Sequence, residues 1–127
     1  MFKRIDHIEI TTENLEKTIS FYTDILGFKI KERNRMDRPP LEEIDYLTLG
    51  DTMIEVLAIK EPAPLATHKW QVGYRMMALE VEDMDETIKY LKSKGVEISR
   101  EPVNLAAAKR AEILDSNGIS IELRQWL

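Results

Sequence analysis

Apolar and polar residues alternate at the start of the chain and then change to a helical spacing. Residues 5–12 read IDHIEITT, in which apolar side chains recur at alternate positions, as on a half-buried strand. Over 15–26 the apolar residues recur every three or four positions, which predicts a helix. Asn14 is a suitable N-cap and Gly27 a suitable C-terminal stop, so the pattern predicts a strand followed by a helix.

Three further strands are predicted in the first half. FKIKER, residues 28–33, reads as a strand leading away from the helix. MDRPPLEE, residues 36–43, is expected to be a loop, because paired prolines cannot join the interior of a sheet. IDYLTLG and TMIEVLAI, residues 44–50 and 52–59, form a hairpin around Gly50-Asp51. The first half therefore reads β-α-β-β-β.

The second half repeats the opening of the first. Moving residues 5–26 forward by 69 positions places them on 74–95, where a strand again precedes a helix. Asp83 is the predicted N-cap of this helix and Gly95 its stop. The two segments keep step, and one mismatch stands out: His7 falls on Met76.

The remaining strands complete the repeat. A strand is predicted over 96–103, and 109–115 pairs with 119–126 as a hairpin. The sequence thus predicts an α+β fold of two βαβββ modules with pseudo-twofold symmetry, forming a curved, mixed β-sheet cleft with the helices outside. We expect one domain over residues 1–127, with modules at about 1–61 and 72–127.

Strand alternation sorts the side chains of the four key strands into two faces. The apolar faces, expected to cover the helices, carry Ile8, Ile10, Ile54, Val56, Met77, Leu79, Ile121 and Leu123. The opposite faces carry His7, Glu9, Glu55, Met76, Ala78, Glu80, Glu122 and Arg124. Solvent exposure is the better explanation of any one of these glutamates, since a surface strand has a polar face. Two carboxylates at equivalent positions of two copies, together with a histidine, form a set suited to a divalent metal.

Composition and charge narrow the class of protein. The 127 residues fit one domain with a substantial core, and the net charge of −5 argues against general binding to nucleic-acid phosphates. The absence of cysteine excludes a disulfide framework, a thiolate zinc site and a cysteine nucleophile. There is no signal-peptide pattern and no apolar run near the roughly 20 residues that span a membrane. We expect a soluble cytoplasmic protein that binds neither nucleic acid nor membrane.

Three segments resemble the vicinal oxygen chelate superfamily. DHIEITTENLEKTISFYTDILGF, residues 6–28, resembles its opening, a histidine-bearing strand followed by D-L-E-x-x-x-x-F-Y and L-G-F. ILDSNGISIEL, residues 113–123, resembles its closing F-x-D-P-D-G-x-x-I-E-L, and residues 76–96 resemble its middle segment. The superfamily includes glyoxalase I, methylmalonyl-CoA epimerase, extradiol dioxygenases and bleomycin-resistance proteins. The resemblance covers essentially the whole chain.

The resemblance implies four metal-ligand positions, which fall on His7, Glu55, Met76 and Glu122. The family usually has histidine where this chain has Met76, and a thioether is a poor ligand for the metals concerned. Three alternatives stay open. In the first, His7, Glu55 and Glu122 hold a divalent ion (Ni, Zn, Mn or Fe) together with extra waters. In the second, the ion binds weakly or only with substrate. In the third, the protein has lost the metal and kept a pocket. His68, the only other histidine, lies in KEPAPLATHKW, residues 60–70, the one linker-like stretch of the chain.

Four residues are predicted to contact a small-molecule substrate. Met53 and Met76 share the polar faces with the expected ligands and would line an apolar pocket, and Arg124 shares that face as well. Arg35 flanks the predicted loop, where basic residues of glyoxalase-like relatives meet anionic substrates; an ordinary solvated charge is the simpler explanation of this residue.

The resemblance also implies an activity and a partner. A glyoxalase I-like lyase or isomerase would act on a small 2-oxo or 2-hydroxy carbonyl compound or its thiol adduct, with Glu122 or Glu55 as the general base. A methylmalonyl-CoA-type epimerase is one alternative. A non-catalytic binding protein of the bleomycin-resistance type is another, which the missing ligand favours. An extradiol dioxygenase is disfavoured, because Met76 removes one histidine of its two-histidine set. The family further implies a homodimer.

Overall fold

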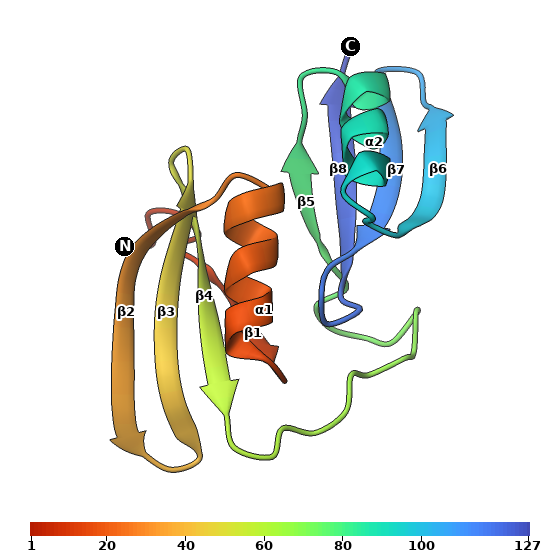
Figure 1. Cartoon of the computed structure of the whole chain (residues 1–127). Coiled ribbons are helices and arrows are strands. Elements are labelled where there is room, and N and C mark those ends of the chain that lie inside the picture. The colour runs from red at the N-terminus through yellow and green to blue at the C-terminus, as the bar shows by residue number, and fades with distance from the viewer. The chain divides into compact units, whose positions relative to one another are not determined.

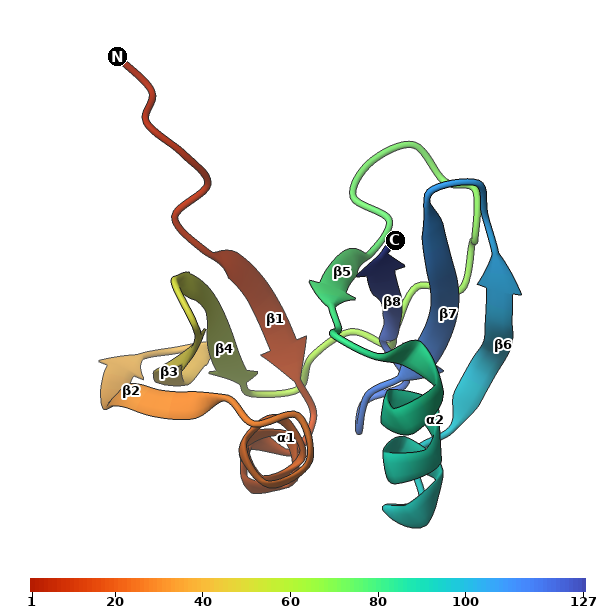
Figure 2. The same cartoon turned by 90° about the horizontal axis from the view of Figure 1, so that it is seen from above.

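A four-stranded sheet with a helix on one face occurs twice along the chain (Figures 1 and 2). The computed structural model describes all residues, 1–127, and divides into two compact units, Met1–Pro64 and Leu65–Leu127. We call them the first and second modules. The prediction of two βαβββ modules is confirmed, whereas their assignment to one domain stays a prediction. Neither helix has the length and apolar character needed to cross a lipid bilayer.

The first module follows the predicted order of elements. They are β1 (Ile8–Thr12), α1 (Leu15–Ser20), the π-helical turn η1 (Phe21–Ile25), β2 (Lys29–Arg38), β3 (Leu41–Leu49) and β4 (Thr52–Ile59). The sheet order is β1-β4-β3-β2, with β1 parallel to β4 and the other pairs antiparallel. Asn14 caps α1, as predicted: its side chain accepts a hydrogen bond from the Lys17 amide at 3.1 Å.

Apolar side chains between α1 and the sheet form the core of the first module. Tyr22, Leu47 and Val56 have no exposed surface, and the Tyr22 ring meets the Phe21 and Phe28 rings edge to face at 5.4 Å. Gly27 follows the helix at a φ of +84°, in the left-handed region that side chains disfavour. The chain therefore turns sharply at the predicted stop and enters β2.

The prediction of a loop over residues 36–43 is wrong. Strands β2 and β3 run almost to its centre, and only Pro39-Pro40 form the turn between them. The prolines fit this place because a turn residue needs no ladder hydrogen bond from its nitrogen. Arg35, expected beside a loop, consequently lies within β2.

The second module repeats the same architecture. Its elements are β5 (Met77–Glu80), α2 (Met84–Ser93), β6 (Ile98–Asn104), β7 (Ala108–Leu114) and β8 (Ser120–Trp126). The sheet order is β5-β8-β7-β6, with β5 parallel to β8. Asp83 caps α2 by accepting from the Glu86 amide at 2.9 Å, as predicted. The Gln125 side chain accepts from the Met84 amide at 2.7 Å and so ties this helix start to β8.

Candidate functional site

His7 lies one residue before β1 and bridges two carboxylates. Its Nδ1 is 2.8 Å from Oδ2 of Asp6, and its Nε2 is 2.7 Å from Oε2 of Glu55 on β4. Because β1 and β4 run parallel with Ile8 opposite Ile54, the neighbouring positions on the other face of the sheet also meet. The parallel pairing thus brings two expected site residues into contact within the first module.

Glu9 adds a third group beside this pair. It lies opposite Glu55 in the register, and one ligand atom from each of His7, Glu9 and Glu55 lies within 4.8 Å of the others. One imidazole nitrogen and two carboxylates suit a borderline or hard divalent cation. The Asp6 carboxylate would fix the ring by holding the second imidazole nitrogen, an arrangement common around metal-binding histidines. The residues present therefore fit a metal ion of the kind that the resemblance implies.

Electrostatics in the first module favour positive charge at His7. The hydrogen bond to Asp6, together with the charges of Glu55 and Glu9, raises the pKa of His7 against the opposing effect of burial. The ring of Tyr46, on β3, meets the imidazole edge to face at 6.2 Å. The charge of Glu55 also raises the pKa of Tyr46, which keeps its hydroxyl protonated. The site thus concentrates negative charge around one imidazole.

Glu122, the ligand and general base expected on β8, lies in an arginine network of the second module. Arg110 Nε donates to its Oε1 at 2.6 Å, and Arg124 Nε donates to its Oε2 at 2.9 Å. Arg110 also donates to Oε1 of Glu112 at 2.7 Å. Both oxygens of Glu122 therefore already accept charge-assisted hydrogen bonds.

The other expected site residues have mixed surroundings. Met76 is half-buried and lies one residue before β5, just as His7 lies one residue before β1. Met53 is half-buried on β4, two residues before Glu55. Arg35 pairs with Glu43 across the β2–β3 ladder, on the face that bears α1 rather than on the face of His7 and Glu55. Their roles in substrate binding stay predictions.

His68 is the second histidine of the chain. It is exposed in the segment 60–76, which contains neither helix nor strand.

Sequence reasoning missed the partners of the expected residues. Asp6 and Tyr46 contact His7, while Arg110 and Glu112 surround Glu122. A signal existed for the last two, because the β7–β8 hairpin places Glu112 directly opposite Glu122 and Arg110 opposite Arg124. The same kind of signal existed for Tyr46, because the predicted hairpin around Gly50-Asp51 places it opposite Glu55.

Comparison with known proteins agrees with this fold. Human mitochondrial methylmalonyl-CoA epimerase is 26% identical over 130 residues, which cover 96% of this chain and 73% of that protein. A lactoylglutathione lyase of Arabidopsis thaliana is 24% identical over 128 residues, which cover 97% of this chain and 44% of that protein. The crystal structure of a glyoxalase family protein from Enterococcus faecalis matches with a TM-score of 0.85 at 26% identity, covering 97% of this chain and 98% of that one.

The match to a family model extends over almost the whole chain. The model of the Glyoxalase/Bleomycin resistance protein/Dioxygenase superfamily covers residues 4–123, which include β1 at one end and most of β8 at the other. Almost all of both modules falls within these bounds, including His7, Glu55 and Glu122. The chain therefore belongs to the Glyoxalase/Bleomycin resistance protein/Dioxygenase superfamily.

Proposed function

We propose that the protein is a glyoxalase I-like lyase or isomerase that moves a proton on a small 2-oxo or 2-hydroxy carbonyl compound or on its thiol adduct. The contact between His7 Nε2 and Glu55 Oε2, at 2.7 Å, carries this proposal. It joins a histidine and a buried carboxylate on the sheet face away from α1, with Glu9 beside them. Family membership and the similarity to a lactoylglutathione lyase support the same chemistry.

The metal would be held by the first-module residues His7, Glu9 and Glu55. Glu122 stands at a further ligand position of the family pattern, but Arg110 and Arg124 already donate hydrogen bonds to both of its oxygens. A bound divalent ion would act as a Lewis acid toward two adjacent substrate oxygens. Nickel, zinc, manganese and iron all suit one imidazole and several carboxylates. Met76, at the fourth ligand position of the family, would add little, because a thioether is a soft donor.

The chain's own residues would orient the histidine, move the proton and donate a hydrogen bond. Asp6 accepts from Nδ1 of His7 and so directs Nε2 toward Glu55. We assign the general base to Glu55 rather than Glu122, because Arg110 and Arg124 occupy both oxygens that Glu122 would need for a proton. Tyr46, close to His7 and paired with Glu55 in the register, would serve as a neutral hydrogen-bond donor.

Calorimetry with Ni²⁺ and Zn²⁺ on untagged, chelator-treated protein tests the metal site. We expect binding to weaken by about tenfold or more in His7→Gln, since one imidazole ligand is lost. His68→Gln is the matched control, because it removes the second histidine from an exposed segment outside both sheets. Equal affinities in the two variants would refute a metal site at His7.

Turnover assays separate the candidate reactions. The metal-loaded protein would be given a glutathione hemithioacetal in one reaction and methylmalonyl-CoA in another, with proton exchange from D₂O followed by NMR. The proposal predicts exchange that is lost in Glu55→Gln but kept in Glu42→Gln, which changes an exposed carboxylate on β3. Turnover of methylmalonyl-CoA alone would favour the epimerase alternative.

A non-catalytic binding protein of the bleomycin-resistance type is the second candidate. The two arginines on Glu122 favour it, together with Met76 in place of a histidine, because both reduce the number of available ligands. This candidate predicts saturable ligand binding by chelator-treated protein and no proton exchange with any metal.

A further inference from the structure

One face of the second-module sheet gathers four arginines around two buried or half-buried glutamates. We call this set, Arg75, Arg100, Arg110, Arg124, Glu112 and Glu122, the arginine face. The register places Arg110 opposite Arg124 and Glu112 opposite Glu122, and it places Arg100 opposite Glu112, so the strand residues point to the same side. That side is opposite to the one that carries the buried side chains of Ile113, Ile121 and Leu123.

The carboxylates do not satisfy all four guanidinium groups. Glu122 uses one oxygen for Arg110 and the other for Arg124. Glu112 receives a hydrogen bond from Arg110, but Arg75 and Arg100 approach it only to 3.6 and 3.7 Å. These two distances exceed a hydrogen bond, so a further acceptor between the arginines and Glu112 would improve their geometry.

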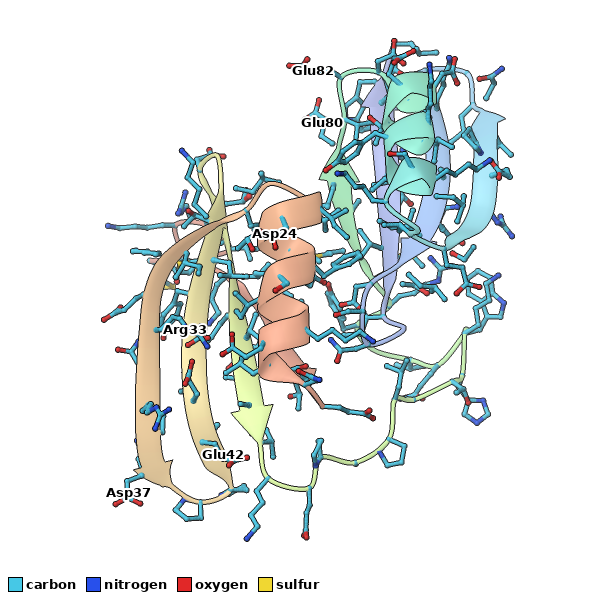
Figure 3. All side chains as sticks on the ribbon, in the orientation of Figure 1. Asp24, Arg33, Asp37, Glu42, Glu80 and Glu82 are labelled. Atoms are coloured by element: carbon cyan, nitrogen blue, oxygen red, sulfur yellow. The ribbon has the colours of Figure 1, made fainter.

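Charge at this face favours an anionic acceptor. Burial raises the pKa of Glu112, yet the hydrogen bond from Arg110 and the charges of Arg110, Arg100 and Arg75 outweigh that effect and lower it. Glu80 is the third carboxylate whose register places it on this side, and it is exposed on the edge strand β5 (Figure 3). Four arginines against three glutamates leave one net positive charge (4 − 3) in a protein of net charge −5.

Two tryptophans stack on this set. The guanidinium carbon of Arg75 lies 4.6 Å from the ring centre of Trp70, and that of Arg124 lies 5.0 Å from the ring centre of Trp126. Stacking holds each guanidinium plane while leaving its N–H groups at the edge available for planar, bidentate recognition. Carboxylate and phosphate are the groups that match such an edge.

We propose that the arginine face binds an oxyanion, the carboxylate or phosphate of a small molecule, and that Glu112 and Glu122 are positioning residues that order its arginines. The proposal rests on the proposed function and deepens it, because the face carries Glu122 and the predicted substrate contact Arg124 and would bind an anionic group of the ligand; this binding needs no metal. Glu122 then keeps a role even if it neither binds a metal nor moves a proton.

Fluorescence titration of chelator-treated protein at constant ionic strength tests this site. The chain contains only two tryptophans, and both stack on arginines of the site, so they report binding directly. Malonate is the carboxylate probe and inorganic phosphate is the phosphate probe. We expect a saturable change across the millimolar range with at least one of them; saturation by one alone identifies the oxyanion class.

Variants of the less tightly paired arginines complete the test. Arg75→Gln and Arg100→Gln leave the Arg110–Glu122 bond in place, and each should weaken binding about tenfold by removing a charge-assisted contact. Lys109→Gln is the matched control: it removes a positive charge one residue from Arg110, on the other side of β7, where Lys109 pairs with Asp85 of α2.

Two results would overturn the proposal. The first is a tryptophan fluorescence that shows no saturable change with either probe. The second is equal affinity in wild type, Arg75→Gln and Arg100→Gln. Because every titration uses protein freed of metal by chelator treatment, neither result bears on the metal chemistry proposed for His7 and Glu55.

Discussion

Asp45 is a fully buried carboxylate on the face of the first-module sheet that carries α1. Arg33 of β2, labelled in Figure 3, has its Nε 3.0 Å from Oδ2 of Asp45, but the geometry leaves both Asp45 oxygens without a hydrogen bond. The same guanidinium also pairs with Glu43 at 2.9 Å and with Glu16 of α1. Three carboxylates thus share one arginine, and the buried one, Asp45, accepts no hydrogen bond from it.

The magnitude of the effect follows from this environment. Burial, and next the neighbouring carboxylate of Glu43, raise the pKa of Asp45 from 3.8 to about 6, while Arg33 opposes the change. The folded protein therefore binds the proton more tightly than the unfolded chain does. The stability that the protonated group contributes is fully present below the unfolded pKa of 3.8 and is lost as pH rises through about 6. The loss relative to the neutral form is about 1 kcal/mol at pH 4.5 and about 3 kcal/mol at pH 8.

Asp45→Asn removes this titration with little change of shape. We expect the variant to be more stable than wild type at pH 8 by ~1–3 kcal/mol, and its advantage should shrink by about 2 kcal/mol on going to pH 4.5. Urea unfolding followed by far-UV circular dichroism at several pH values measures the difference. Asp37→Asn is the control, since Asp37 is exposed near the end of β2 and points away from the sheet (Figure 3).

Two outcomes would contradict the reasoning. If Asp45→Asn is less stable than wild type at pH 8, the ion pair with Arg33 outweighs the cost of burying the carboxylate. If the difference between the two proteins stays constant from pH 4.5 to 8, the carboxylate titrates as it does in the unfolded chain, and the effect assigned to burial is absent.

Three further predictions concern the metal, the core and assembly. Met76→His should raise the affinity for Ni²⁺ or Zn²⁺ measured by calorimetry, because an imidazole replaces a thioether at the fourth ligand position of the family; an unchanged affinity would remove Met76 from that position. Leu47→Ala should lower the free energy of unfolding by about 2–5 kcal/mol in urea, since Leu47 has no exposed surface, whereas Leu65→Ala, at a 48% exposed position, should cost much less. Sedimentation at micromolar concentration should show a homodimer, and a monomer there would count against the family's usual assembly.

Local sequence predicted most of the secondary structure. Asn14 and Asp83 cap the two helices because each places a side-chain oxygen near amides that have no helical partner. The alternation in β1 and β4 correctly separated Ile10, Ile54 and Val56, which are buried, from the residues on the opposite face. These features depend only on neighbours along the chain, so a single sequence is enough to predict them.

The length of the β2–β3 hairpin was mispredicted, because it does not depend on neighbours along the chain alone. Proline indicates a break wherever it occurs, but the sequence does not say how close to it a strand can continue. In the structure, the ladder continues beyond Arg35 and Glu43 to Arg38 opposite Leu41, directly beside the two prolines. Cross-strand partners, which local patterns do not contain, decided where the strands ended.

The surroundings of the charged residues were decided only by the tertiary structure. The sequence determined that His7 and Glu55 share a face, that Glu122 occupies the equivalent position to Glu55, and that Met76 replaces a histidine. It did not determine that Asp6 orients His7, that Asp45 is buried, or that Arg110 and Arg124 hold Glu122. A strand pattern assigns each side chain to a face, but the energy of a charge depends on which side chains from other strands meet it there. Those contacts depend on the register of the strands, which is set only when the strands pair into a sheet.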